Sequence, residues 1–125
     1  MMAQTEKARS FEDVGIWKKA HQFVLDVYKI TKKFPKHEIY CLTSQLRRAA
    51  ISIPANFAEG FRKSTKPDKL RFYGIAISSL EECRYYLRLA SDLGYAETVN
   101  LRSDLEEISR MLTSYMSKIR NDVRG

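Results

Sequence analysis

Glycine, proline, cysteine and histidine are all scarce in this chain, which has five glycines, three prolines, two cysteines and two histidines in 125 residues. The glycines are dispersed, so no glycine-rich loop is available to hold a phosphate group. Cys41 and Cys83 lack the spacing of a metal site, and we expect reduced thiols in a cytoplasmic protein. No segment approaches about eighteen uninterrupted apolar residues, which predicts that nothing here enters or crosses a membrane.

The two histidines also exclude the di-iron chemistry that helical bundles can support. Such a centre needs Glu-x-x-His pairs, but Lys18 stands at that spacing before His21 and Phe34 before His37. His37 lies four residues before Cys41, yet no third group or donor nest accompanies this pair for nucleophilic catalysis. We therefore predict that the protein is not an enzyme and binds no metal or other cofactor.

The apolar residues repeat every three or four positions, which is typical of amphipathic helices. The sequence contains no Asn-Gly or Asp-Gly turn and no long alternation of β-branched residues, so nothing indicates a strand. Four helices are predicted, from Ser10 to Pro35, from near His37 to Gly60 or Phe61, from Ser64 or Thr65 to Gly94, and from Leu101 towards Val123. Short connections between helices of this length predict an all-α, up-down-up-down antiparallel four-helix bundle. Residues 10–125 are expected to form this single domain, after a disordered N-terminal tail at residues 1–9.

The segment Leu42–Gly60 organises the chain. Its core-facing residues are separated by three or four positions and are Leu42, Leu46, Ala49, Ile53 and Phe57. Pro54 removes one amide hydrogen bond, so a kink is predicted there. Gly60 is interpreted as the C-terminal stop of the helix.

A second stripe runs along the opposite side of the same helix and places small residues between charged ones: Arg48, Ser52, Ala55 and Glu59. Small side chains let another backbone come close, which favours a docking seam, and a solvated face is the alternative. The first helix has an apolar arc wider than a four-helix core needs. We therefore expect Trp17 and Phe23 at a subunit interface.

Positive charge is concentrated within a chain whose net charge is +7. Between Gln45 and Arg71, only Glu59 and Asp68 offset the cationic side chains of Arg47, Arg48, Arg62, Lys63, Lys66, Lys69 and Arg71. Such a concentration is typical of a surface that faces a polyanion, and ordinary solubilising charge at a helix turn is the alternative. The residues predicted to contact RNA or DNA phosphates, without base specificity, are Arg47, Arg62, Lys63, Lys66, Lys69 and Arg71. Aromatic residues that could stack or pack are interleaved with them, namely Phe61, Phe72 and Tyr73.

Two runs carry a resemblance to a known family: FPKHEIYCLTSQLRRAAISIPANFAEGFRKS and IAISSLEECRYYLRLASDLGY. They resemble the four-helix bundle family encoded by intervening sequences in large-subunit ribosomal RNA genes. The segment SFEDVGIWKKAHQFVLDVYKITKKF is similar to that family's first helix, so the resemblance covers most of the chain. Ser78 departs from the glycine that the family often has before Ser79 and Leu80. The positions that match the family's motif are Gln45, Arg47, Arg48, Pro54, Asn56, Glu59 and Gly60.

This resemblance implies a left-handed four-helix bundle that assembles into a ring-like homopentamer. It also implies similarity to the accessory variability determinant of diversity-generating retroelements, a pentamer with a basic surface that works with a reverse transcriptase and nucleic acid. The resemblance leaves open whether the motif positions serve assembly or ligand contact, and the small-residue stripe favours assembly for Arg48 and Glu59. The predicted oligomer interface includes Gln45, Arg48, Ser52, Ala55, Asn56 and Glu59.

The sequence therefore predicts a non-enzymatic, oligomeric helical bundle that binds RNA or another nucleic acid through a basic surface. The rival prediction is an interaction adaptor whose first helix docks a protein partner, with the basic charge incidental.

Overall fold

The computed structural model describes residues 10–122, and within that range it contains helices and no strand. The elements are the 3-10 turn η1 (Phe11–Asp13), α1 (Gly15–Thr31), the 3-10 turn η2 (Lys36–Glu38), α2 (Leu42–Arg62), α3 (Lys66–Asp92) and α4 (Val99–Asn121). The prediction of an all-α bundle of four helices is confirmed. The predicted tail at residues 1–9 and the end of the last helix at Val123 lie outside the described residues.

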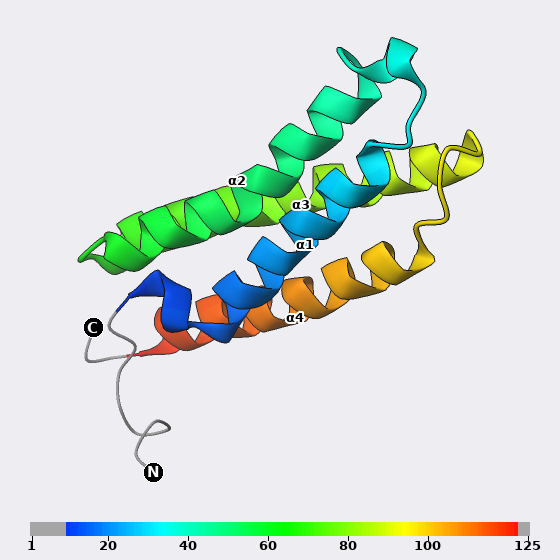
Figure 1. The fold of residues 1–125 in the computed structure, drawn as a ribbon. Coiled ribbons are helices and arrows are strands. Elements are labelled where there is room, and N and C mark those ends of the chain that lie inside the picture. Colours follow the sequence, from blue (N-terminus) through cyan, green and yellow to red (C-terminus); the bar gives the residue numbers. More distant parts are fainter. Residues whose placement is uncertain (1–9, 123–125) are drawn as a thin grey trace.

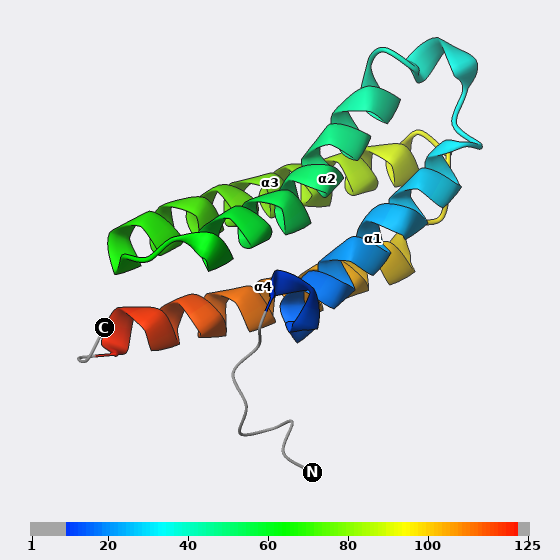
Figure 2. The same ribbon diagram turned by 60° about the vertical axis from the view of Figure 1, so that its left-hand side comes forward.

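Consecutive helices run in opposite directions. Figure 1 shows the α1–α2 and α3–α4 links at one end of the bundle and the short α2–α3 turn at the other, and Figure 2 shows the same arrangement from a second direction. Each helix contacts the helices before and after it in the chain, and α4 also contacts α1, which closes the bundle. The contact between α2 and α3 is the most extensive. The helix α2 continues through Pro54 without interruption. A kink at that proline and a left-handed bundle stay predictions.

The core consists of aliphatic side chains along most of the bundle and aromatic side chains near the α2–α3 turn. Leu46, Ile53, Leu80, Leu87 and Leu105 are fully buried in the first part. The rings of Phe57, Tyr73 and Tyr115 pack against one another in the second part, with centroid separations of 5.2 to 5.6 Å.

Phe23 belongs to this core and is only 1% exposed. A side chain so completely enclosed by its own subunit has no surface to offer another, so its assignment to a subunit interface is wrong. Within the wide apolar arc of α1, one stripe is buried in the core, and Phe23 belongs to it together with Ala20 and Val27. The sequence pattern alone did not separate that stripe from its exposed neighbours.

The beginning of α2 lies about one turn later than predicted, at Leu42 instead of near His37. The intervening residues form η2, and the Glu38 side chain reaches forward to the helix. Its Oε1 accepts a hydrogen bond from the Leu42 amide at 3.2 Å, and its Oε2 accepts one from the Tyr95 hydroxyl at 2.7 Å. Both hydrogen bonds lower the pKa of Glu38, and the one from Tyr95 has the larger effect. Glu38 therefore caps α2 and ties it to the α3–α4 link.

The beginning of α3 agrees with the sequence prediction. The Thr65 hydroxyl accepts a hydrogen bond from the Asp68 amide at 3.3 Å, and Pro67 lies in the first turn. The helix ends at Asp92, and Gly94 has a φ of 78°, a left-handed conformation that favours glycine.

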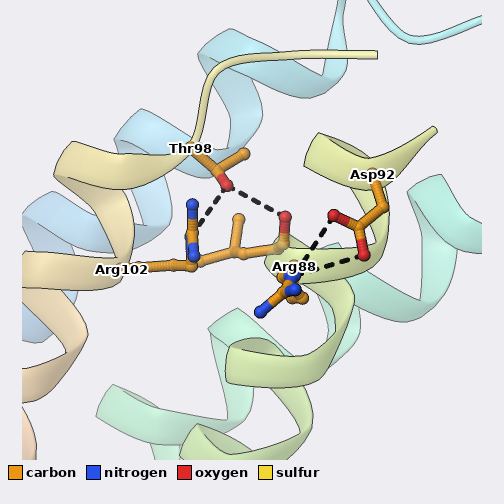
Figure 3. Close-up of polar contacts among 5 residues, drawn as sticks. Arg88, Asp92, Thr98 and Arg102 are labelled. Carbon is orange, nitrogen blue, oxygen red and sulfur yellow. Dashed lines mark hydrogen bonds and ion pairs between the residues drawn. The ribbon is translucent and has the colours of Figure 1, made fainter. Parts of the chain in front are cut away.

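A buried threonine fixes the approach from this turn into α4. Thr98 is fully buried, and its hydroxyl donates a hydrogen bond to the carbonyl oxygen of Leu87 at 2.9 Å. Figure 3 shows Arg102 donating to the same hydroxyl, at 3.1 Å, while Arg88 pairs with Asp92 nearby. The end of α3 and the beginning of α4 are thus joined by polar contacts as well as by core packing.

Gly60 is not the C-terminal stop that the sequence predicts, because α2 continues to Arg62. A Cβ atom at this position would lie 2.6 Å from Cε1 of Tyr73 and 3.2 Å from the carbonyl oxygen of Lys69. The glycine is needed because the ring and backbone of α3 approach α2 so closely here.

Candidate nucleic-acid interface at the α2–α3 turn

The turn between α2 and α3 brings five of the predicted nucleic-acid contacts together. Only three residues separate the two helices, so the last turn of α2 and the first turns of α3 place their charged side chains at the same end of the bundle. We call the set the basic turn, and it consists of Arg62, Lys63, Lys66, Lys69 and Arg71. Arg62 and Arg71 are exposed, and the other three are partly buried.

Phe72 lies between two cations of the basic turn. The Nζ atom of Lys63 is 5.1 Å from the centre of the Phe72 ring, and the Cζ atom of Arg71 is 4.5 Å from it. Both separations are within the range of a cation–π interaction. Lys63 also pairs with Glu59 at 3.6 Å, one turn earlier on α2. Of the aromatic residues interleaved in this region, Phe72 therefore helps to position the charges, whereas Tyr73 is fully buried in the core.

Lys69 has a different role from the other cations in the turn. Its Nζ donates hydrogen bonds to the carbonyl oxygens of Phe61 at 2.9 Å and Gly60 at 3.3 Å. Burial lowers the pKa of its ammonium group. A cation at this position satisfies the free carbonyls at the C-terminus of α2 and interacts favourably with the helix dipole. Lys69 therefore stabilises the turn itself and presents less of its charge to a ligand.

Arg47 is not part of this cluster. It precedes Arg62 by fifteen residues on the same helix, which corresponds to roughly 22 Å along the helix axis. Its Nε donates a hydrogen bond to the Thr31 hydroxyl at 2.8 Å, and its guanidinium lies 4.6 Å from the centre of the Tyr28 ring. The grouping of Arg47 with the turn residues is therefore wrong, because fifteen residues of α2 separate Arg47 from Arg62 and Thr31 of α1 holds its side chain.

The small-residue stripe of α2 divides between two faces. Ser52 accepts a hydrogen bond from the Ser79 hydroxyl at 2.7 Å, and Asn56 donates to the Ser52 hydroxyl at 2.8 Å. The backbone that the small Ser52 side chain lets approach is therefore that of α3 in the same chain. Ala55 is exposed and lies on the α1 side, where it lines a hollow with Trp17.

The remaining residues of the predicted interface lie at the surface. Gln45, Arg48 and Glu59 are all exposed, and within residues 10–122 Arg48 forms no ion pair. The sequence interpretation missed Ile51, which is 42% exposed beside the Ala55 hollow. The signal that could have found it is an apolar residue of Leu42–Gly60 that lies outside the predicted core-facing stripe.

Between residues 10 and 122, no group of three or more His, Cys, Asp or Glu side chains is placed to hold a metal ion. Both cysteines are free, and burial, followed by the nearby Glu82 charge, raises the pKa of the Cys83 thiol to about 12. No helix in that range is long and apolar enough to span a bilayer.

The fold and the basic turn define a class of protein, a four-helix bundle with concentrated positive charge at one end. The family of 23S rRNA-intervening sequence proteins matches residues 12–114, and the chain belongs to this family. None of the curated proteins matches the chain.

A solved structure has the same fold. It is the crystal structure of a protein of unknown function from the S23 ribosomal protein family of Bacteroides thetaiotaomicron, and it superposes with a TM-score of 0.75. The two sequences are 22% identical, and the alignment covers 81% of this chain and 97% of the other. At this level of identity the likeness supports the architecture alone.

Proposed function

We propose that the protein is a non-enzymatic, oligomeric bundle that binds RNA through the basic turn without reading base sequence. The observation that carries this proposal is the density of cations at the turn, where five of the ten residues from Arg62 to Arg71 are Lys or Arg. The family is named for intervening sequences in 23S rRNA genes, so we take RNA as the polyanion to test first.

The geometry of the turn suits phosphate contacts better than base recognition. Within the described residues, Arg62, Lys66 and Arg71 have no carboxylate partner, so their charges are available to an incoming phosphate. Lys63 shares its charge with Glu59, which is itself exposed. If the protein makes four phosphate contacts to single-stranded RNA, its affinity should fall about fifty-fold when the salt concentration rises from 50 to 200 mM.

Fluorescence anisotropy with a labelled single-stranded RNA, measured over a salt series, tests the proposal. The variant replaces Arg62, Lys63, Lys66 and Arg71 by Gln and keeps Lys69, because Lys69 caps α2. We expect this variant to lose at least ten-fold in affinity at 50 mM salt and most of the salt dependence.

The matched control removes the same number of charges at the opposite end of the bundle, where four exposed lysines are replaced by Gln: Lys29, Lys32, Lys33 and Lys36. It should bind RNA nearly as the wild type does. Absence of RNA binding by the wild type at low salt would refute the proposal, and so would an equal loss in both variants.

The oligomer is the second part of the proposal, and the family resemblance favours a homopentamer. Light scattering on purified protein tests it directly, because one chain has a mass of 14.6 kDa. A nucleic-acid-linked partner such as a reverse transcriptase-like protein is proposed on the same resemblance.

An adaptor that binds a protein partner is the second candidate function. The half-buried Trp17 and the exposed Ile51 favour it, because they leave apolar surface on α1 and α2. Binding of a protein partner that survives the substitutions in the basic turn, with no RNA binding by the wild type, would select the adaptor.

A further inference from the structure

We propose that the surface between α1 and α2 receives the outer face of α3 from a second copy of this chain, with Arg48 paired to Glu82 of that copy. The inference rests on the oligomeric part of the proposed function and is independent of RNA binding. It assigns the two different surfaces that each copy would use.

The receiving surface consists of two joined hollows between α1 and α2. One, of about 350 Å³, includes Tyr28, Ile39 and Arg48 in its lining. The other, of about 280 Å³, includes Trp17 and Ala55. Ile51 lines both, so the hollows adjoin, and we call the two together the α1–α2 groove.

The α1–α2 groove is mostly apolar in the hollow at Ala55 and carries polar and positively charged residues in the hollow at Arg48. No acidic residue lines either hollow, and the cations are Arg47 and Arg48. Arg47 is held by Thr31 and Tyr28, whereas Arg48 forms no ion pair within residues 10–122. A partner that fills this groove therefore needs apolar side chains and one carboxylate near the Arg48 end.

The outer face of α3 has this chemistry. Positions three, four and seven apart on a helix share one face, and the residues there form what we call the α3 ridge: Ile75, Ser78, Glu82 and Leu89. Ile75 is 39% exposed, and Leu89 is partly buried. Glu82 is exposed and, within the described residues, forms no ion pair, whereas the adjacent Glu81 pairs with Arg84.

The spacing of the two surfaces matches. Ala55 follows Arg48 by seven residues, and Ile75 and Leu89 lie seven residues before and after Glu82. Seven residues correspond to about 10.5 Å along a helix. When Glu82 of one copy meets Arg48 of another, an apolar ridge residue therefore lies at the Ala55 hollow in either direction of α3.

This arrangement has a consequence for assembly. The α1–α2 groove and the α3 ridge are different surfaces, so the contact is heterologous and every copy can use both. Repeated contacts of this kind form a ring if the rotation closes and a filament if it does not.

Charge reversal at the two paired positions tests the inference, with mass measured by size exclusion and light scattering. Arg48→Glu and Glu82→Arg each place like charges opposite one another, and each should weaken assembly at least ten-fold and shift the mass towards 14.6 kDa. The double variant Arg48→Glu/Glu82→Arg should recover the wild-type mass, and mixing the two single variants should restore assembly.

Two exposed residues of α4 supply the controls, because neither Asp104 nor Arg110 forms an ion pair in the described part of the chain. Asp104→Arg and Arg110→Glu make the same charge changes away from both surfaces and should keep the wild-type mass. Helix content measured by circular dichroism establishes that every variant is folded.

Several results would overturn the inference without refuting the proposal that the basic turn binds RNA. Single reversals that keep the wild-type mass, or a double variant that stays dissociated, would show that Arg48 and Glu82 do not meet. A reversal of Arg48 that lowers RNA affinity without changing the mass would assign Arg48 to the nucleic acid. Wild-type protein that scatters as a 14.6 kDa chain would overturn both this inference and the proposed oligomer, and would leave the groove to another protein.

Discussion

Replacement of Gly60 by Ala tests the close approach of α2 and α3 that the structure shows. The added methyl group would lie 2.6 Å from Cε1 and 2.9 Å from Cδ1 of Tyr73. The Tyr73 ring has little freedom to move, because it is fully buried and stacked on Phe57 with its centroid 5.2 Å away. The backbone of Lys69 is 3.2 Å from the same position and restricts a shift of α3.

The magnitude follows from two opposing effects. Overpacking of a well-packed core costs about 1–3 kcal/mol. Alanine is more favourable than glycine within a helix by about 1 kcal/mol, which offsets part of that cost. We therefore expect Gly60→Ala to lower the free energy of unfolding by up to about 2 kcal/mol.

Gly74 provides the matched control. It lies within α3, and a Cβ atom there would have no other atom within 4 Å. Gly74→Ala should therefore raise the free energy of unfolding by about 0.5–1 kcal/mol. The two substitutions are chemically identical and should have opposite signs.

Urea denaturation followed by circular dichroism measures both variants, at one protein concentration because assembly shifts the apparent stability. A Gly60→Ala variant that is as stable as Gly74→Ala would refute the reasoning, since the contact with Tyr73 would then impose no constraint.

Three further predictions concern single side chains. The buried Tyr73 hydroxyl makes no hydrogen bond of good geometry, and Tyr115 is the polar side chain that acts on it. Tyr73→Phe should therefore leave the free energy of unfolding unchanged or raise it by up to about 1 kcal/mol in urea denaturation, and a loss of stability would reveal a hydrogen bond to Tyr115. The lowered pKa of Glu38 means that its cap stabilises the fold above its usual pKa of 4.5 and is lost as the pH falls through the lowered value. Glu38→Gln should therefore be less stable than wild type at pH 7, and in urea titrations the difference should shrink as the pH is lowered below 4.5, whereas a difference independent of pH would contradict the cap. Leu105 is fully buried, so Leu105→Ala should cost about 2–5 kcal/mol by thermal or urea unfolding, and a cost below about 1 kcal/mol would show that the core is not closely packed there.

Features that depend on neighbouring residues in the chain were predictable. The four helices follow from the apolar period, and the Thr65 cap with Pro67 in the first turn follows from local hydrogen bonding and backbone geometry. The gathering of charge at the α2–α3 turn was predictable for the same reason, because a turn of three residues leaves its flanking side chains little room to separate.

Features that depend on a distant element were not predictable. The beginning of α2 at Leu42 depends on Glu38, and Glu38 is held by Tyr95 from the link between α3 and α4. A local reading placed the helix start near His37 because nothing in that segment reveals the contact. Arg47 was grouped with the turn cations, although fifteen residues of α2 separate it from Arg62 and Thr31 of α1 holds it.

The sequence by itself determined that the protein is a bundle of amphipathic helices with concentrated positive charge beside one turn. Periodicity, capping and charge are properties of short segments, and they survive whatever the segments pack against. The tertiary structure alone decided which of several apolar and small-residue stripes became core. Phe23 is buried in the core, and Ser52 forms a hydrogen bond with Ser79 of α3. Ala55 and Ile51 are exposed at the surface. A sequence pattern shows which faces of a helix are apolar, but the positions of the neighbouring helices decide which of those faces are buried.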